Sequence, residues 1–301
     1  MKLAILYAGQ GSQHPGMGKE FYEGSPAFRA AFDSAELDFD LHRVCFEDPD
    51  GLLNQTEYTQ PCMVAFACGV TAVLAQQGVK PAYVAGLSLG EYSALEAAGV
   101  FTAKQAIELA AYRGKAMAEA AKGIDCGMTA VLNLDRQALA ACCEQAAQLG
   151  CVQICNYNCP GQLVIAGEKA ALAEAIENCK AAGARRALPL AVSGAFHTPL
   201  MAEAAAELRA FVSDFTFSAP TMNIYSNLDG QVYDCSNLPE HLEQHMISPV
   251  RWTRLVQNGM AAGLTSACEV GPGKTLTGFA GKISKELTCK TVQDMAGVQA
   301  A

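Results

Sequence analysis

The residues best suited to chemistry stand at positions 86–90, which read GLSLG and set Ser88 between two glycines. The short apolar segment 82–85 before them predicts a buried strand, and residues 91–98 predict a helix. Strand, tight turn and helix are the context in which the serine of a G-x-S-x-G motif acts as a nucleophile. The N-terminus of such a helix offers N–H groups and a positive dipole end to a developing oxyanion. We therefore predict a catalytic serine; the alternative is a structural turn.

A serine nucleophile needs a base, and the chain has five histidines. His197 lies in the segment 193–199 between a predicted strand and a predicted helix, where α/β folds place catalytic groups. The alternative is a histidine in a helix-capping loop. His241 and His245 have i,i+4 spacing on a predicted helix, but the Glu of an H-E-x-x-H motif is missing, so we expect no metal site.

Arg113 is the third residue of interest, because it falls in an apolar stripe. Ala106, Ala110, Arg113 and Met117 share one face of a predicted helix. An arginine buried there is costly unless it is paired or faces a cavity. The functional interpretation is a guanidinium that binds a carboxylate; the alternative is an arginine that snorkels at the edge of the stripe.

Composition limits the class of protein. The 301 residues are 51% hydrophobic and 17% charged, which excludes a disordered chain, and the net charge of −9 argues against nucleic-acid binding. No apolar run approaches the ~20 residues of a membrane span, and no export signal is evident, so we expect no membrane association. The thirteen cysteines are an odd number without C-x-x-C spacing, which favours reduced thiols in the cytoplasm. Residues 271–275 fail the phosphate-loop motif because Cys268 replaces its first glycine.

Two helices that precede and follow the pentapeptide have clear start signals. Residues 62–77 predict a buried apolar helix with Pro61 in its first turn. Thr102 and Gln105 predict a capping box that opens a helix ending near Lys122.

Alternating strands and helices predict an α/β protein with a mostly parallel sheet covered on both faces. Between residues 125 and 191 the order becomes β-α-β-β-α-β, which is the ferredoxin-like pattern. We predict a catalytic core of residues 1–124 and 192–301 and an inserted ferredoxin-like subdomain of residues 125–191.

Seven ordered motifs identify a family resemblance. Over essentially its whole length the chain resembles the malonyl-CoA:acyl carrier protein transacylases of fatty acid biosynthesis, through residues 9–13 (GQGSQ), 86–94 (GLSLGEYSA), 113–115 (RGK), 156–162 (NYNCPGQ), 194–197 (GAFH), 248–252 (SPVRW) and 269–274 (EVGPGK). The resemblance implies an α/β-hydrolase-like core with the ferredoxin-like insertion. It further implies malonyl-CoA and acyl carrier protein as partners, a monomer, and no cofactor.

The resemblance also implies roles for the three residues singled out above. Ser88 would attack the malonyl thioester, His197 would take its proton and later activate the incoming thiol, and Arg113 would hold the free carboxylate. An acyl-serine intermediate of this kind gives ping-pong kinetics.

Five further roles come from the resemblance alone. The backbone N–H groups of Gln10 and Leu89 would form the oxyanion hole, and the carbonyl of His245 would orient the base. Phe196 and Asn158 would line the substrate pocket, and the phenylalanine is typical of malonyl-selective members. The chain departs from the family at position 87, where Leu replaces His, and at position 245, where His replaces Gln.

Other functions share part of this site. A serine hydrolase, either an esterase or an editing thioesterase, would use the serine and histidine but has no need of the arginine. An acyltransferase of a polyketide pathway and a non-catalytic module that binds carrier protein are further alternatives. For an acidic carrier protein, Lys180, Arg185 and Arg186 form a candidate docking patch; an ordinary solvated helix end is the alternative.

Overall fold

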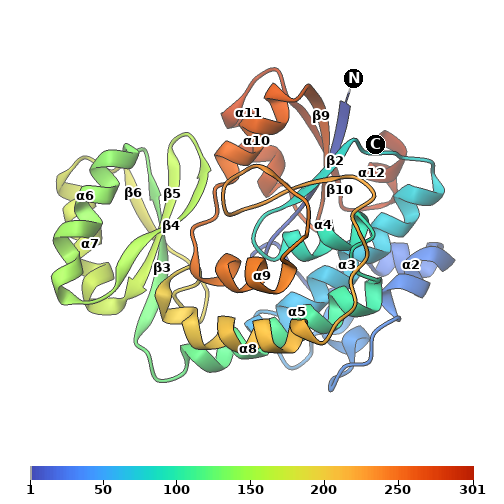
Figure 1. The fold of residues 1–301 in the computed structure, drawn as a ribbon, viewed down its shortest axis with the longest axis horizontal. Coiled ribbons are helices and arrows are strands. Elements are labelled where there is room, and N and C mark those ends of the chain that lie inside the picture. Colours follow the sequence, from blue (N-terminus) through green and yellow to red (C-terminus); the bar gives the residue numbers. More distant parts are fainter. Residues whose placement is uncertain (1) are drawn as a thin grey trace.

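The computed structural model describes residues 2–301 and contains two separate β-sheets with their helices (Figure 1). The larger one, sheet A, has the strand order β10-β9-β1-β2-β7-β8. Its strands are β1 (Lys2–Tyr7), β2 (Tyr83–Gly86), β7 (Asn223–Tyr225), β8 (Val232–Tyr233), β9 (Leu264–Val270) and β10 (Thr288–Val292). Every pairing is parallel except that of β7 with β8, so the predicted mostly parallel sheet is confirmed.

The register of sheet A brings three loops together. Tyr7 at the end of β1 pairs with Gly86 at the end of β2 and with Val270 at the end of β9. Because parallel strands share a carboxyl edge, the loops that follow them meet at that edge. The pentapeptide and the two glycine-rich segments that begin at residues 9 and 271 therefore lie side by side.

Sheet B is antiparallel, with the order β4-β5-β3-β6, and stands apart from sheet A in Figure 1. Its elements are β3 (Cys126–Leu132), α6 (Arg136–Ala146), a 3-10 turn (Ala147–Leu149), β4 (Val152–Cys159), β5 (Gln162–Glu168), α7 (Lys169–Ala181) and β6 (Arg186–Pro189). The predicted order β-α-β-β-α-β is thus confirmed. The side chain of Asp135 caps α6 by accepting hydrogen bonds from the N–H groups of Gln137 and Ala138.

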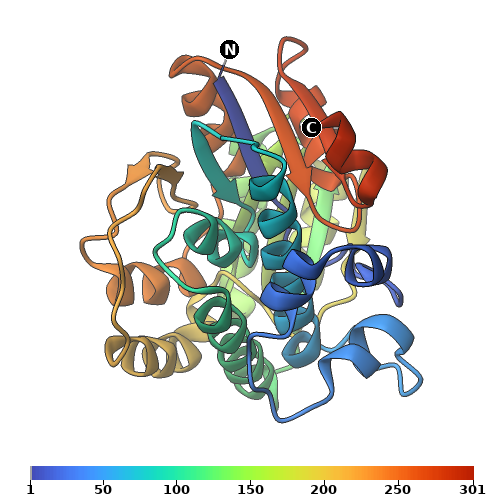
Figure 2. The same cartoon turned by 90° about the vertical axis from the view of Figure 1, so that its right-hand side faces the viewer.

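Three helices lie at the carboxyl edge of sheet A or cover it: α3 (Thr56–Gln76), α4 (Gly90–Ala97) and α5 (Ala103–Ala121). Figure 2, seen from the side away from sheet B, shows the helices of the first hundred residues in front of sheet B, with the first two strands of sheet A in view above them. Both hydrogen bonds of the predicted Thr102–Gln105 capping box are present in α5. The predicted start of α3 is wrong, because the helix begins at Thr56 and holds Pro61 in its interior. Packing against α5, where Gly114 fits beside the Thr56 carbonyl, outweighs the proline signal.

The length of α3 also corrects the expectation about apolar runs. Its 21 residues have a window of mean hydropathy 1.4, enough to span a membrane by length and composition. However, 78% of that window is buried inside the fold. The burial on all sides explains why the helix has almost no polar face: it is a core helix.

The remaining helical elements complete the layers around sheet A. They are α1 (Lys19–Gly24), α2 (Pro26–Phe32), a π-helical turn (Arg43–Glu47), a 3-10 turn (Pro199–Met201), α8 (Ala202–Ser213), α9 (Leu238–Ile247), α10 (Trp252–Ala261), α11 (Thr275–Ile283) and α12 (Met295–Ala300). All thirteen cysteines are free thiols and nine of them are buried.

Candidate active site

Ser88 occupies a strained turn between β2 and α4, with a φ of 50°. The two flanking glycines are required by close backbone approaches. A Cβ atom at Gly86 would lie 1.9 Å from the Gly90 carbonyl oxygen, and one at Gly90 would lie 2.2 Å from the Tyr7 carbonyl oxygen. The two glycines are therefore required where the turn approaches the start of α4 and the end of β1.

His197 contacts the serine from the loop before α8, as its position in the sequence predicts. Its Nε2 lies 2.6 Å from the Ser88 Oγ, and its Nδ1–H donates to the carbonyl oxygen of His245 at 3.0 Å. The amide of Gln153 on β4 donates to the His197 carbonyl at 2.9 Å, which ties the loop to sheet B. Within residues 2–301 no carboxylate forms an ion pair with His197. A backbone carbonyl thus holds the position that an acid has in a Ser-His-Asp triad.

The environment keeps His197 neutral. Burial lowers its pKa to about 4, the positive charge of Arg113 adds to this effect, and the hydrogen bonds to His245 and Ser248 act in the opposite direction. A neutral imidazole with Nδ1–H fixed on a carbonyl leaves the Nε2 lone pair free to accept the serine proton.

Arg113 is 1% exposed and reaches the same point from α5. Its predicted apolar stripe is confirmed, since Ala106, Ala110 and Met117 are all buried with it. One terminal nitrogen donates to Gln60 Oε1 at 2.8 Å, the other to Ser88 Oγ at 3.4 Å, and Nε has no partner. Burial lowers the pKa of the guanidinium, but no carboxylate pairs with it in residues 2–301. The site therefore holds a buried cation with no carboxylate in direct contact, and Glu91 acts on it only at longer range.

A cavity of about 210 Å³ joins these groups. The predicted residues Gln10, Leu89, Asn158 and Phe196 all line it, together with the serine, histidine and arginine. In residues 2–301 the N–H groups of Gln10 and Leu89 have no hydrogen-bond acceptor, and Asn158 Oδ1 is buried without a partner. These groups are free to bind a polar ligand that enters the cavity. His245 does not line the cavity; its carbonyl contacts the Nδ1–H of His197 instead.

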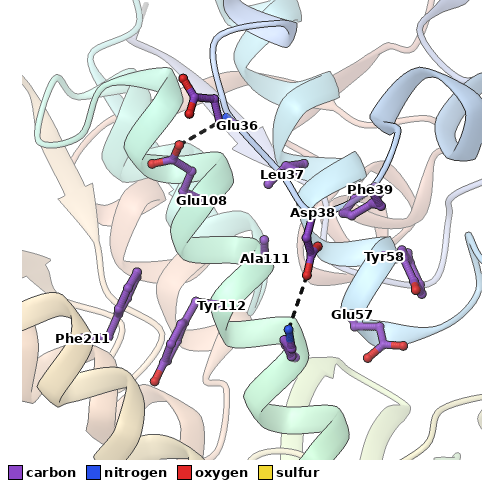
Figure 3. Close-up of a pocket in the computed structure, with 11 residues that line it drawn as sticks. Glu36, Leu37, Asp38, Phe39, Glu57, Tyr58, Glu108, Ala111, Tyr112 and Phe211 are labelled. Atoms are coloured by element: carbon purple, nitrogen blue, oxygen red, sulfur yellow. Dashed lines mark hydrogen bonds and ion pairs between the residues drawn. The ribbon is translucent and has the colours of Figure 1, made fainter.

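Two larger hollows lie elsewhere and lack a nucleophile with a base. One, of about 380 Å³, lies on the outer side of α5, and Figure 3 shows Tyr112 and Phe211 stacked at its edge. The other, of about 640 Å³, borders the hairpin of β4 and β5, where Arg136 and Arg251 both contact the Tyr157 ring. Volume alone would thus have selected the wrong site.

Sequence reasoning missed several residues that hold the site together. Asn227 follows β7 and accepts a hydrogen bond from the Ser88 N–H at 2.8 Å. Glu91 is fully buried behind the turn that carries Ser88. Glu91 stands next to the motif and could have been noticed as a charge in an apolar segment. Nothing in the local sequence singles out Asn227.

The other predicted positions lie apart from the cavity. Nε2 of His241 donates to Glu91 Oε1 at 2.5 Å, and no cluster of three His, Cys, Asp or Glu suited to a metal occurs in residues 2–301. Lys180 is exposed and pairs with Glu177 at 2.6 Å, whereas Arg185 and Arg186 are exposed at the start of β6.

Comparisons with known proteins agree over the full length. The acyl transferase domain family matches residues 5–297. Malonyl CoA-acyl carrier protein transacylase of Salmonella typhimurium is 41% identical over 304 residues, covering 100% of this chain and 98% of that protein. The enzyme of the same name from Bacillus subtilis is 37% identical, covering 100% of this chain and 96% of that protein.

Solved structures give the same result. An acyl carrier protein S-malonyltransferase from Vibrio cholerae superposes with a TM-score of 0.95 at 41% identity, covering 100% of this chain and 99% of that one. A malonyl-transacylase solved in complex with a type II PKS acyl-carrier protein superposes with a TM-score of 0.96 at 37% identity, covering 100% of this chain and 99% of that one. The chain therefore belongs to the malonyl-CoA:acyl carrier protein transacylase family.

Proposed function

We propose that this protein transfers the malonyl group of malonyl-CoA to the phosphopantetheine thiol of an acyl carrier protein in fatty acid biosynthesis. One observation supports this function above others: the buried guanidinium of Arg113 has no carboxylate partner and lies 3.4 Å from the Ser88 oxygen. A single methylene separates the carboxylate of a malonyl group from its thioester carbonyl. A malonyl group can therefore pair with the arginine while its carbonyl carbon faces the serine.

In the first half-reaction the Ser88 Oγ attacks the thioester carbon as its proton passes to His197 Nε2. The N–H groups of Gln10 and Leu89 then stabilise the oxyanion. The C–S bond breaks, the imidazolium protonates the departing CoA sulfur, and a malonyl ester remains on Ser88. Arg113 contributes by positioning, since a bound carboxylate restricts how the carbonyl can lie.

In the second half-reaction His197 takes the proton of the carrier-protein thiol. The thiolate attacks the ester carbonyl, the bond to Ser88 Oγ breaks, and the imidazolium returns the proton to that oxygen. Each half exchanges a thioester and an ester, so the residues of the chain suffice and no cofactor is invoked. The small volume of the cavity, about 210 Å³, favours this exchange over hydrolysis, since a bound acyl group leaves little room for water.

A hydrolase is disfavoured, because an esterase of neutral substrates would leave the Arg113 charge buried and unpaired. The polyketide alternative concerns the carrier protein rather than the chemistry. We further propose that sheet A with its helices (residues 1–124 and 192–301) is an α/β-hydrolase-like core. Residues 125–191 would then form a ferredoxin-like insertion, a proposal supported by the strand order β4-β5-β3-β6. The free thiols fit a reducing compartment such as the cytoplasm, and the monomeric state stays a prediction.

We propose that the carrier protein's arm enters along edge strand β6. Leu188 pairs with Ala130, a cavity residue, and Leu190 lines the cavity itself. Both leucines are unusually exposed for their type, at 43% and 38%. Arg186, two positions before Leu188, lies on the same face of the strand because successive side chains alternate between faces. This path would place an arginine where an acidic carrier protein approaches.

Reversing the charges of Arg185 and Arg186 to glutamate should raise the apparent KM for carrier protein about tenfold at low salt. The KM for malonyl-CoA should not change. Lys169→Glu, on the helix of the same sheet, is the matched control and should behave as wild type. An equal rise for malonyl-CoA would contradict the docking surface. Assays with two purified carrier proteins, of fatty acid and polyketide type, would identify the physiological acceptor.

Intact-protein mass spectrometry after brief exposure to malonyl-CoA tests the function itself. A malonyl adduct should form on the wild type, be absent from Ser88→Ala, be weak with acetyl-CoA, and disappear when phosphopantetheinylated carrier protein is added. Free malonate without an adduct would instead indicate a hydrolase.

A further inference from the structure

One buried side chain, that of Asn227, forms hydrogen bonds at two points of the turn 86–90, the elbow that carries Ser88. Its Oδ1 accepts a hydrogen bond from the Ser88 N–H at 2.8 Å, and its Nδ2 donates to the Gly86 carbonyl at 2.6 Å. Both ends of the side-chain amide are thus used on the elbow, and Asn227 is 0% exposed. Because Ser88 has a positive φ, a contact that fixes its N–H also fixes the direction of the serine side chain.

Asn227 is itself held by the carboxylate of Glu91, in the first turn of α4. The N–H of Asn227 donates to Glu91 Oε2 at 2.9 Å. The other oxygen, Oε1, accepts a hydrogen bond from His241 Nε2 at 2.5 Å. Glu91 is also 0% exposed, so these two donors take the place of water at its oxygens, while His245 Nε2 lies 3.8 Å from Oε2, beyond hydrogen-bond distance.

The second donor leads to the base. His241 lies on α9, one helical turn before His245, whose carbonyl accepts the Nδ1–H of His197. Starting at Ser88, hydrogen bonds run through Asn227 and Glu91 to His241, and the backbone of α9 carries the connection on to His197. The buried carboxylate of Glu91 therefore connects Asn227, which fixes the backbone of Ser88, to α9, whose His245 carbonyl orients His197.

We propose that Asn227, Glu91 and His241 are positioning residues for the acylation step, with Glu91 as the node that sets the serine and histidine relative to each other. This inference rests on the proposed roles of Ser88 and His197. None of the three residues lines the cavity, so their effect should fall on the rate of acylation and not on substrate binding. A misplacement of the reacting groups by about 1 Å costs on the order of 100-fold in rate.

The test compares single-turnover rate constants of Ser88 acylation by malonyl-CoA with the rate of Ser88 labelling by a fluorophosphonate. Asn227→Ala should slow both by about 10- to 100-fold, with the KM for malonyl-CoA within twofold of wild type. Single-turnover rate constants do not depend on the folded fraction, so simple destabilisation would leave them unchanged. The matched control is Asn258→Ala, since Asn258 donates a 2.7 Å hydrogen bond to Gly230 in the same loop without contacting the elbow.

A second pair of variants tests the hydrogen bond between His241 and Glu91, and this test does not require that Asn227→Ala folds. His241→Phe keeps a ring against Tyr233, which stacks on His241 with centroids 3.9 Å apart, but removes the donor to Glu91. It should slow both reactions, and His241→Gln, whose amide can still donate, should restore part of the rate.

The outcomes are distinguishable from failure of the proposed function. Undiminished rate constants in Asn227→Ala or His241→Phe would overturn the inference while leaving the transacylase intact. A wild-type protein that reacts with the fluorophosphonate but forms no malonyl adduct would overturn the function, and the labelling rates of the variants would still decide on the positioning residues. Equal slowing by His241→Phe and His241→Gln would also count against the inference, since the donor would then be irrelevant.

Discussion

Replacing Arg113 with methionine is expected to lower kcat/KM for malonyl-CoA by about 10²- to 10³-fold, the scale of losing a buried charge-assisted contact. Methionine fills much of the same volume on α5 but offers no donor to a carboxylate. Activity toward acetyl-CoA should fall little or rise, because acetyl lacks the carboxylate and leaves the wild-type guanidinium unpaired. The measurement is the acylation rate with malonyl-CoA and with acetyl-CoA, followed by mass spectrometry. The ratio of the two rates should fall in Arg113→Met relative to the wild type.

The control for this prediction is Arg209→Met on α8. Arg209 forms a half-exposed ion pair with Glu243 at 2.8 Å, and such surface pairs contribute little. This variant should retain wild-type activity with both thioesters. If Arg113→Met lowered both activities equally, the arginine would have a structural role and the carboxylate assignment would be wrong.

Replacing His197 with glutamine should lower the acylation rate by about 10²- to 10⁴-fold, since no other group lies at 2.6 Å from the serine oxygen to accept its proton. The pH profile provides an independent check. Because burial and Arg113 lower the pKa of His197 to about 4, the base stays neutral well below pH 6.5. The kcat/KM of the wild type should therefore stay level from pH 7 to about pH 5 and fall tenfold per pH unit below about pH 4.

Arg113→Met links the two predictions. Removing the positive charge removes one cause that lowers the His197 pKa, so the acidic limb of the profile should move to higher pH. If the acidic limb did not move in Arg113→Met, the titrating group would not be His197. The same conclusion would follow if the residual activity of His197→Gln still showed that limb.

The sequence predicted much of this site because its signals are local. The glycines around Ser88, the stripe that contains Arg113 and the loop that holds His197 each depend on a few neighbouring residues. The family resemblance supplied Gln10, Leu89, Asn158, Phe196 and His245, which no local pattern distinguishes.

The parts that could not be predicted depend on contacts between distant segments. Asn227 reaches the serine across 139 positions, and Glu91 meets His241 across 150. Neither pairing leaves a periodicity or spacing that can be recognised in one sequence. The start of α3 was predicted wrongly for a related reason: Pro61 is a local signal for the first turn of a helix, and only the packing of α3 on α5 outweighs it.

The placement of β1 in sheet A has a consequence for how the chain is made. Its neighbour β9 is synthesised about 260 positions later, so β1 keeps an open edge through most of translation. Contacts of such long range form slowly and leave partly folded chains prone to aggregation. The same order of synthesis delays activity, since Ser88 and Arg113 leave the ribosome long before His197 and the carbonyl of His245. On the proposed roles, a nascent chain would carry its nucleophile before its base, and the Ser88–His197–His245 contacts could form only after residue 245 has been synthesised.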